Sequence, residues 1–387
     1  MECAEIDYLP ITRENLDVAA KAGAKWGMPR SVGWYARILF DPTVEDLTDD
    51  PIRGHMAVLR QTGEVVAIQC YYYHPLFFKC KKYLAMSGCI MGASHDYAAE
   101  IFCVLEENEK THNVTEFFCT NDLANIKSAS IHKFVHKAND APIASNHFHI
   151  RAVDISICAE FVMDRVFPKG NALSSFCNVT MGRLTWFLSR PVQWMIDLYR
   201  LIRLGSGDYD CVCLNEIPMA QFETFWKRFL ASNCDSVVSS REPQRLKWLF
   251  EESIKARKVQ LIVAMRDGLV DGYVMTRRCI GACRPSIEII DICAVNNDAK
   301  CLSCLINACN VRARKCGVLE IRLFMYRSDL RKWFSTGIHI KRQLSHITFL
   351  WAALLDDARK SLEAGDGWFF GPFDGERCMG YGGFIDL

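Results

Sequence analysis

The sequence lacks any apolar run that reaches the ~18 residues of a membrane-spanning helix. It also lacks a charge excess: 46 Lys and Arg residues face 45 Asp and Glu residues, so the net charge of +1 predicts no dedicated nucleic-acid binding. The N-terminus has no apolar core of a secretion signal, so we expect a cytoplasmic protein with reduced thiols. Half of the 387 residues are hydrophobic, which excludes wholesale disorder. At roughly 150 residues per domain, the length suggests two or three domains.

Nineteen cysteines are present, but they do not have the spacing of a metal site. Cys301-x-x-Cys304 lies in a helical context, and no second C-x-x-C pair lies within zinc-ribbon distance. Histidine pairs at positions 132/136 and 147/149 are more typical of surface or hydrogen-bonded residues, and the first pair lacks the glutamate of a zinc-protease motif. We therefore predict no metal site, with cysteine serving as a small hydrophobic residue.

An internal repeat organises the chain. Each half contains a strand, an arginine, a glycine turn and a second strand, which is typical of a β-hairpin. The hairpins cover residues 55–73 and 260–275, and Arg60 and Arg266 are 206 positions apart. Apolar strands follow at 83–91 and 287–295, with Cys89 and Cys293 204 positions apart.

A helix and a further strand follow in both halves. The expected apolar helix faces are Ala98, Ile101, Phe102 and Leu105 in the first half, and Leu302, Leu305, Ile306 and Cys309 in the second. The next strands begin at Val114 and Val318, again 204 positions apart. The spacing predicts two copies of one α/β module: an N-terminal module at 1–155 and a C-terminal module with a tail at 209–387. We expect a helical linker at 156–208, whose basic amphipathic stretch 184–204 packs between domains or rests on a membrane surface.

The order of elements resembles the Gcn5-related N-acetyltransferase (GNAT) fold, here as two tandem modules over about residues 5–155 and 209–355. The resemblance implies an α/β (α+β) fold in which each module is a mixed, mostly antiparallel sheet flanked by helices. Asn121-Asp-Leu-Ala124, expected to follow the fifth strand and open a helix, matches the family's Asn-x-x-Ala. Two segments, 241–248 and 368–375, resemble GNAT-like acyltransferases from bacterial polysaccharide- and lipid-associated gene neighbourhoods: Arg241-Glu-Pro…Leu246-Lys-Trp248 and Trp368-Phe-Phe-Gly-Pro-Phe-Asp374-Gly375.

The resemblance implies acetyl-CoA or another acyl-CoA as donor. In the family the fourth and fifth strands splay apart, the pantetheine pairs with the freed edge, and the next helix N-terminus faces the pyrophosphate. The implied cofactor-binding residues are Met91, Gly92, Ser94, Asn121 and Ala124 in the first half and Val295 and Lys300 in the second. Neither half has the usual Arg/Gln-x-x-Gly-x-Gly/Ala loop, and Asp96 and Asp298 would place negative charge near the phosphates. Because Asn121 and Ala124 adjoin it, the first-half loop is favoured.

Four residues are candidates for proton transfer during acyl transfer. Glu288 and Asp291 lie on the fourth strand of the second half; being three apart, they are expected on opposite faces. A structural role for Asp291 is equally open. Tyr326 is a candidate acid, and His95 follows the fourth strand of the first half. Tyr71, Tyr72 and Tyr73 are candidates to line an acceptor pocket, with Tyr71 and Tyr73 on one face.

These features predict an acyltransferase that passes the acyl group directly to an amine or hydroxyl of a small or sugar-like acceptor. One alternative is a degenerate tandem module that binds a partner or scaffolds a pathway, which the missing phosphate loop favours. A second is an aminoacyl-tRNA-dependent transferase of the FemAB type, which would need a basic groove and usually a helical arm, and no such arm is apparent.

Overall fold

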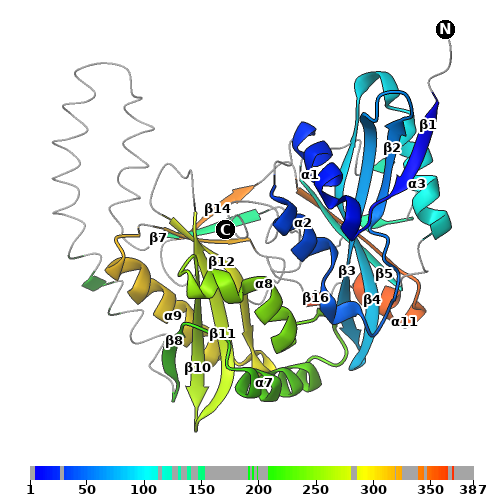
Figure 1. The fold of residues 1–387 in the computed structure, drawn as a ribbon. Helices are drawn as coiled ribbons and strands as arrows, with labels where there is room; N and C mark the ends of the chain where they lie inside the picture. Colours follow the sequence, from blue (N-terminus) through cyan, green and yellow to red (C-terminus); the bar gives the residue numbers. More distant parts are fainter. Residues whose placement is uncertain are drawn as a thin grey trace, which may run out of the picture. The chain divides into compact units, whose positions relative to one another are not determined.

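The described part of the chain forms two compact units built from interleaved segments. The computed structural model describes residues 5–26, 30–111, 116–123, 130–131, 137–140, 147–152, 191, 194–195, 198, 208–279, 286–318, 320–324, 339–343, 347–364 and 368–369. Unit 1 consists of Met1–Asn146, Ile217–Ser253 and Ser345–Leu387, and unit 2 of His147–Glu216 and Ile254–Leu344. Each unit contains one β-sheet with flanking helices (Figure 1), as the predicted fold class requires. The module boundaries at 155 and 209 stay a prediction.

Unit 1 holds a nine-stranded sheet. Its main path runs β1 (Ile6–Pro10), β2 (Gly54–Leu59), β3 (Val65–Phe78), β4 (Lys81–Ala93), β5 (Phe117–Leu123), β15 (Ile347–Ala353) and β6 (Asn139–Asp140), and β9 (Val237–Ser239) joins β3 to β16 (Trp368–Phe369). Pairing is antiparallel from β1 to β4 and parallel between β4 and β5. The sheet is therefore mixed and mostly antiparallel.

Unit 2 holds a seven-stranded sheet. Its order is β14 (His339–Gln343), β7 (His147–Ala152), β13 (Glu320–Phe324), β12 (Ser286–Ala294), β11 (Leu269–Arg278), β10 (Val259–Arg266) and β8 (Asp210–Leu214). Here β12 and β13 form the parallel pair, in the place that β4 and β5 take in unit 1. The two sheets thus repeat one another, as the spacing predicts.

The two halves of the chain exchange a strand. β7 comes from the first half, yet it lies between β13 and β14 in the sheet of unit 2. β15 comes from the second half and lies between β5 and β6 in the sheet of unit 1. Each sheet is therefore completed by a strand that the other half supplies.

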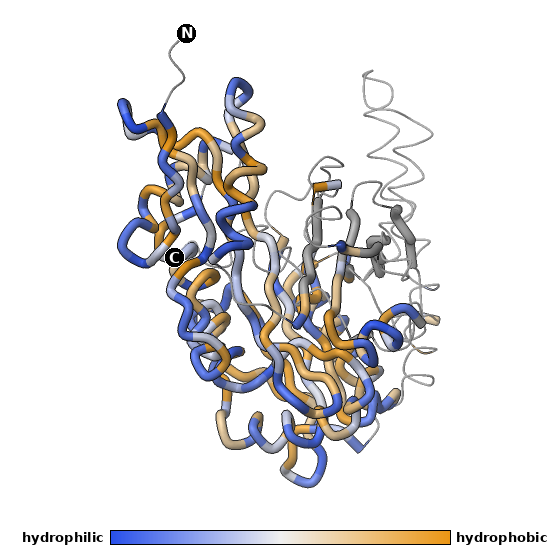
Figure 2. The backbone as a smooth tube through the Cα atoms, turned by 90° about the vertical axis from the view of Figure 1, so that its right-hand side faces the viewer, coloured by the Kyte–Doolittle hydropathy of each residue, from blue (hydrophilic) through white to orange (hydrophobic). Residues whose placement is uncertain are grey.

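Seven helices are described: α1 (Leu16–Lys25), α2 (Val32–Leu39), α3 (Glu100–Thr111), α7 (Met219–Ser232), α8 (Pro243–Lys255), α9 (Ala299–Lys315) and α11 (Asp356–Ala364). In α7 the four large aromatic residues recur at helical spacing and are all buried: Phe222, Phe225, Trp226 and Phe229. Short 3₁₀ turns lie at η1 (Arg13–Asn15), η2 (Pro42–Val44), η3 (His95–Tyr97) and η4 (Val295–Asn297). Figure 2 shows apolar colour along the central strands and polar colour at the turns.

The two faces of the unit 1 sheet pack against different helices. Tyr71 and Tyr73 share a cluster with Ile101 and Leu105 of α3, as strand alternation predicts. α1 lies near the other face, where a Cβ on its Gly23 would approach Ile90. All three tyrosines at 71–73 are buried, so they pack in the core and do not line an open acceptor pocket.

The expected apolar face of α3 is partly wrong. Phe102 is 53% exposed, whereas Val104 is fully buried. Ala98 precedes the helix, which begins at Glu100, so the helical repeat cannot be counted from Ala98. The buried face consists of Ile101, Val104, Leu105 and Asn108.

A β-bulge interrupts the fourth strand of each sheet. In unit 1 the pairing of β3 with β4 skips Cys89, and in unit 2 the pairing of β11 with β12 skips Ile290. These positions are 201 residues apart, so the fourth strands do not keep the 204-residue spacing predicted from Cys89 and Cys293. The two cysteines are not equivalent, because the sheet register and not the cysteine position aligns the strands.

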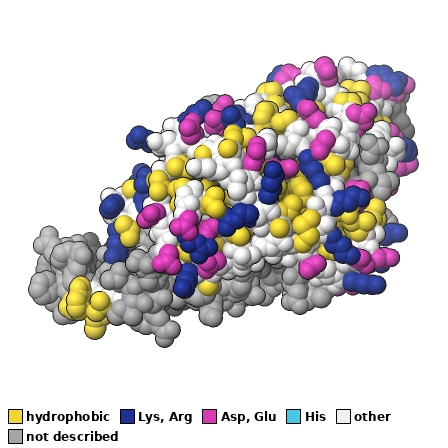
Figure 3. Space-filling view, turned by 90° about the horizontal axis from the view of Figure 1, so that it is seen from below, with side chains coloured by type: hydrophobic (Ala, Val, Ile, Leu, Met, Phe, Trp, Pro, Cys, Tyr) yellow, Lys and Arg dark blue, Asp and Glu magenta, His cyan; other side chains and the backbone are white. Residues whose placement is uncertain are grey.

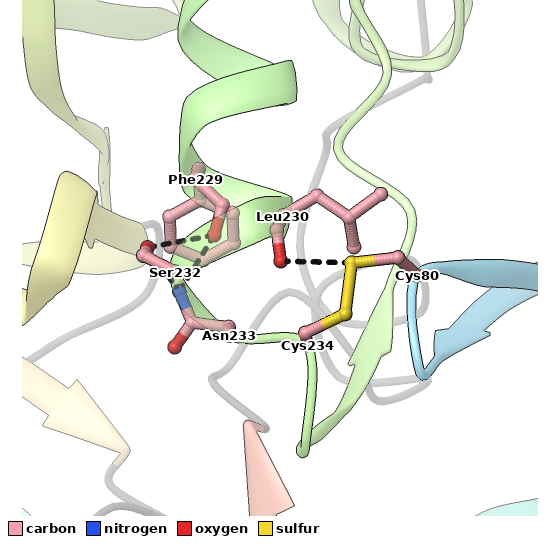
Figure 4. Close-up of a disulfide and its surroundings, with 6 residues drawn as sticks. All are labelled: Cys80, Phe229, Leu230, Ser232, Asn233 and Cys234. Atoms are coloured by element: carbon pink, nitrogen blue, oxygen red, sulfur yellow. Dashed lines mark hydrogen bonds between the residues drawn. A yellow bond between two sulfur atoms is a disulfide. The ribbon is translucent and has the colours of Figure 1, made fainter.

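A disulfide joins Cys80 to Cys234 within unit 1, across 154 residues of sequence. Cys80 lies in the two-residue turn between β3 and β4, where both Lys79 and Cys80 have positive φ. The Lys79 backbone N–H donates to the Cys234 carbonyl at 2.7 Å. Cys234 follows α7, whose end is closed by the Asn233 side chain donating to the Phe229 carbonyl at 2.8 Å (Figure 4). The expectation that all thiols are reduced is wrong for this pair.

No helix among the described residues is long and apolar enough to cross a membrane. The amphipathic stretch 184–204 and the histidine pair at 132/136 lie almost wholly outside the described residues.

Candidate active site

The parallel strands of unit 1 diverge soon after they meet. Pairing between β4 and β5 covers residues 85–86 and 117–118, while β4 runs on to Ala93 and β5 to Leu123. On its other side β5 pairs with β15 along its whole length. Within the described residues, the facing edges of β4 and β5 beyond this point have no strand between them. Their backbone groups can pair with an extended ligand that carries amides.

The loop after β4 lies at the open end of this divergence. The Ser94 backbone N–H donates to the Val66 carbonyl at 2.7 Å, which anchors the loop to β3. The Ser94 hydroxyl oxygen is buried and has no hydrogen-bond partner within the described residues. His95 and Asp96 are exposed and lie 3.3 Å apart, Nδ1 to Oδ1. Such a hydroxyl can hydrogen-bond to a polar ligand that reaches this loop.

Gly92 and Met91 are accounted for by packing. A Cβ on Gly92 would lie 2.7 Å from Cγ of Trp26, so the missing side chain makes room for the indole. Met91 packs against the cluster that contains Tyr71 and Tyr73. Neither residue requires a ligand to explain its identity.

In the equivalent loop of unit 2, the carboxylate of Asp298 lies at the N-terminus of the following helix. Asp298 caps α9 by accepting from the Lys300 backbone N–H at 2.8 Å, and the Tyr209 hydroxyl donates to it at 2.6 Å. Burial raises the pKa of Asp298, but these hydrogen bonds outweigh it and leave the pKa below its usual value. Val295 is buried, and the Lys300 side chain is exposed. An ionised carboxylate therefore occupies the helix N-terminus where a phosphate would bind.

Unit 1 carries a related pair. Tyr8, 201 positions before Tyr209, donates its hydroxyl to Glu100 at 2.6 Å, and Glu100 lies in the first turn of α3. The tyrosine–carboxylate contact is thus part of the repeat, although the sequence spacing alone did not reveal it. In unit 1 the carboxylate lies inside the helix and not at the residue before it.

Solved structures of known proteins have a similar overall fold. The GCN5-related N-acetyltransferase from Kribbella flavida aligns with a TM-score of 0.51 over 91% of this chain and 71% of its own, at 10% identity. Saccharomyces cerevisiae N-myristoyltransferase with bound myristoyl-CoA aligns with a TM-score of 0.51 over 91% and 80%, at 9% identity. This chain has the GNAT fold. An Enterococcus faecalis protein described as a probable N-acyltransferase also aligns, with a TM-score of 0.50 over 89% and 72%, at 11% identity.

Sequence comparison adds nothing finer to the GNAT fold. No family model matches the chain, and no curated protein matches it. At identities of 9–11% the structural likeness establishes the fold and leaves the reaction to be argued from the residues.

The two carboxylates on β12 are both buried and both engaged. Glu288 accepts from Arg277 at 2.8 Å in an ion pair whose side chains are less than a tenth exposed. Asp291 is 1% exposed and accepts a hydrogen bond from the Tyr273 hydroxyl. Their partners on β11, Arg277 and Met275, are two residues apart, so the bulge at Ile290 places both carboxylates on one face. The expectation of opposite faces is wrong, because simple alternation ignores the extra residue.

The remaining predicted residues are placed in part. Asn121 lies inside β5, opposite Phe349 of β15, so the expectation that it follows the fifth strand and opens a helix is wrong. Ala124 and Tyr326 lie outside the described residues. Met91 and Gly92 lie near the end of β4, and Ser94 and His95 lie in the loop that follows it, whereas Glu288, Asp291, Val295 and Lys300 lie in unit 2.

The segment 241–248 anchors α8 within unit 1. Arg245 is 2% exposed and lies 3.2 Å from the carboxylate of Asp41, which is also buried. Arg241 is fully buried and donates to the Ser239 carbonyl at 2.8 Å. The Trp248 indole donates to the Arg37 carbonyl at 2.9 Å. These contacts give the Arg-x-Pro-x-x-Leu-x-Trp pattern a structural role.

A hollow of about 900 Å³ in unit 1 lies beside this segment. Pro42, Met219 and Trp248 form apolar parts of its wall. Its charged lining comprises Arg37, Lys82, Lys247, Glu45, Asp46, Glu242, Glu251 and Glu252. None of the predicted site residues lines it, because its walls come from α2, η2, α7 and α8, which are distant in sequence. Glu242 and Trp248 lie inside the segment singled out above, which is the signal that could have found this hollow.

Proposed function

We propose that the protein is an acyl-CoA-dependent acyltransferase whose donor binds between β4 and β5 of unit 1. The observation that carries the proposal is the divergence of these strands beyond residues 86 and 118, which leaves backbone groups free to pair with pantetheine amides. The partnerless hydroxyl of Ser94 fits the same ligand. Met91, Gly92, Asn121 and Ala124 complete the proposed donor site. Bound acyl-CoA supplies a thioester carbonyl open to attack by a nucleophile.

The proposed acceptor is an amine or hydroxyl of a small or sugar-like molecule that attacks the thioester directly. Of the four candidates for proton transfer, His95 lies exposed on the loop of unit 1 and can accept the acceptor's proton. Glu288 and Asp291 are held by Arg277 and Tyr273, which favours a structural role for both. Tyr326 stays a candidate acid.

Unit 2 is proposed as a copy that does not bind the donor. The carboxylate of Asp298 fills the position that the pyrophosphate would take, and repulsion between the two is unfavourable. Val295 and Lys300, the donor-binding candidates of this unit, are therefore ranked below those of unit 1. This observation also supports the wider alternative of a tandem module without catalysis.

The tRNA-dependent alternative is less favoured. Lys and Arg side chains alternate with Asp and Glu on the face shown in Figure 3, and the described residues there form no continuous basic groove. We also propose a cytoplasmic location. The Cys80–Cys234 disulfide is the observation that argues against it, because disulfides are rare in that compartment.

Thermal shift with CoA, acetyl-CoA and longer acyl-CoAs tests the proposal. A donor at about 100 times its Kd should stabilise the native protein by roughly 2.7 kcal/mol. Because an N-myristoyltransferase shares the fold, myristoyl-CoA belongs in the series. Ser94→Asp should abolish the shift by placing a charge beside the phosphates, whereas Lys300→Ala in unit 2 should retain it. The reverse pattern would move the donor to unit 2, and no shift with any thioester would contradict the proposal.

A further inference from the structure

Two thiols meet inside unit 2. Sγ of Cys211, on β8, lies 3.2 Å from Sγ of Cys304, on α9. Both cysteines are free, and both are partly exposed at the margin of the unit 2 core. A disulfide bond is ~2.05 Å long, so the sulfurs need to approach by roughly 1 Å more. Among the described strands, β8 is at the edge of its sheet and pairs with β10 alone, so one neighbouring strand restrains it.

The neighbouring cysteines lie in different surroundings. Cys301 is fully buried, and a Cβ on Gly272 would lie 2.6 Å from its sulfur. Burial raises the pKa of the Cys301 thiol well above its usual value. Cys213 lies two residues from Cys211 along β8. The fold therefore brings Cys304 to Cys211, and not to Cys301, with which it shares the C-x-x-C spacing.

The two thiols that meet are not equivalent. The hydrogen bond between the two thiols, which either can donate, lowers the pKa of Cys304, although burial opposes this effect. The same hydrogen bond, followed by burial, raises the pKa of Cys211. Because the thiolate is the nucleophile, this difference favours Cys304 as the attacking sulfur and Cys211 as the resolving one.

We propose that Cys211 and Cys304 are a reversible disulfide-forming site that reacts with a low-molecular-weight disulfide such as oxidised glutathione. The Cys304 thiolate attacks one sulfur of the oxidant, forms a mixed disulfide and releases one glutathione thiolate. Cys211 loses its proton to solvent, its sulfur attacks Sγ of Cys304, and the second glutathione thiolate leaves. Two protein thiols are thereby oxidised, and one glutathione disulfide is reduced to two thiols.

The surroundings favour a crosslink over a metal. Within the described residues, no group of three or more metal-ligating side chains is present. The crosslink would tie β8 to α9, close to the point where Tyr209 donates to Asp298 at the start of that helix. Oxidation therefore stiffens the loop of unit 2 without altering the donor site proposed in unit 1.

Peptide mapping of the full chain tests this site. The protein is reduced, freed of reductant, incubated with oxidised glutathione, alkylated and digested with trypsin without reduction. We expect a disulfide between the peptides 204–227 and 301–312, assigned to Cys211 and Cys304 by fragmentation. Reduced glutathione in excess should reverse it. In a Cys80→Ser background, where the Cys80–Cys234 disulfide cannot contribute, the oxidised protein should also melt at a higher temperature than the reduced one.

Matched serine variants make the assignment specific. Cys211→Ser and Cys304→Ser should each lose the crosslink, whereas Cys213→Ser and Cys301→Ser, on the same strand and helix, should keep it. Complete alkylation of Cys211 and Cys304 in the wild-type protein after oxidation would overturn the proposal, and so would a crosslink through Cys213 or Cys301. The decisive measurement uses the wild-type chain, so a variant that fails to fold does not affect that measurement.

Discussion

The buried ion pair between Arg277 and Glu288 allows a test of whether the Glu288 carboxylate has a structural or a catalytic role. Glu288→Ala should lower the free energy of unfolding by about 3–5 kcal/mol, because it strands a buried guanidinium. Urea unfolding measures this loss. The double change Arg277→Met/Glu288→Leu removes both charges and should cost less. Unchanged stability together with lost acyl transfer would instead make Glu288 the base.

Gly92 offers a second test at the residue scale. A methyl group at this position would contact Trp26, so Gly92→Ala should cost about 1–3 kcal/mol by overpacking. Trp26→Ala should relieve much of that cost, which a double-mutant cycle measures. Additive losses would contradict the packing explanation. Loss of acyl-CoA binding in the double variant would support the proposed place of Gly92 in the donor site.

At the scale of elements, the hairpin of β3 and β4 depends on its crosslink. Two consecutive residues with positive φ, neither of them glycine, form its turn, and Cys80 ties that turn to Cys234 after α7. Cys80→Ser should reduce the stability of the oxidised protein by about 2–5 kcal/mol, measured by thermal unfolding with and without reductant. A free Cys80 in a non-reducing peptide map would restore the expectation of reduced thiols.

At the scale of the whole molecule, the exchanged strands make the two halves dependent on each other. The fragment 1–155 contains β7, which belongs to the other sheet, and lacks β15, the neighbour of β5. We expect it to give no cooperative melting transition, because an exposed strand edge promotes aggregation. Co-expression with 156–387 should restore a folded complex, seen by gel filtration and circular dichroism. A monomeric, cooperatively melting 1–155 would contradict this expectation.

Local patterns predicted much of the secondary structure. The hairpins followed from their glycine turns, and the buried face of α9 followed from Leu302, Leu305, Ile306 and Cys309 at helical spacing. The repeat and the GNAT resemblance followed from the order of these elements. Residues with a role that depends on distant partners were predicted poorly. The hydroxyl of Tyr209 and the carboxylate of Asp298 are 89 residues apart, and no local pattern links them.

The sequence by itself therefore determined the fold class and the tandem repeat, since the order and spacing of the apolar segments can be read along the chain. Tertiary structure decided which strands complete each sheet, which cysteines meet and which carboxylates remain available for proton transfer. The bulge at Ile290 is the clearest example. One extra residue on β12 moves Glu288 and Asp291 onto the same face, because side-chain direction depends on the pairing with β11 and not on the count along the strand.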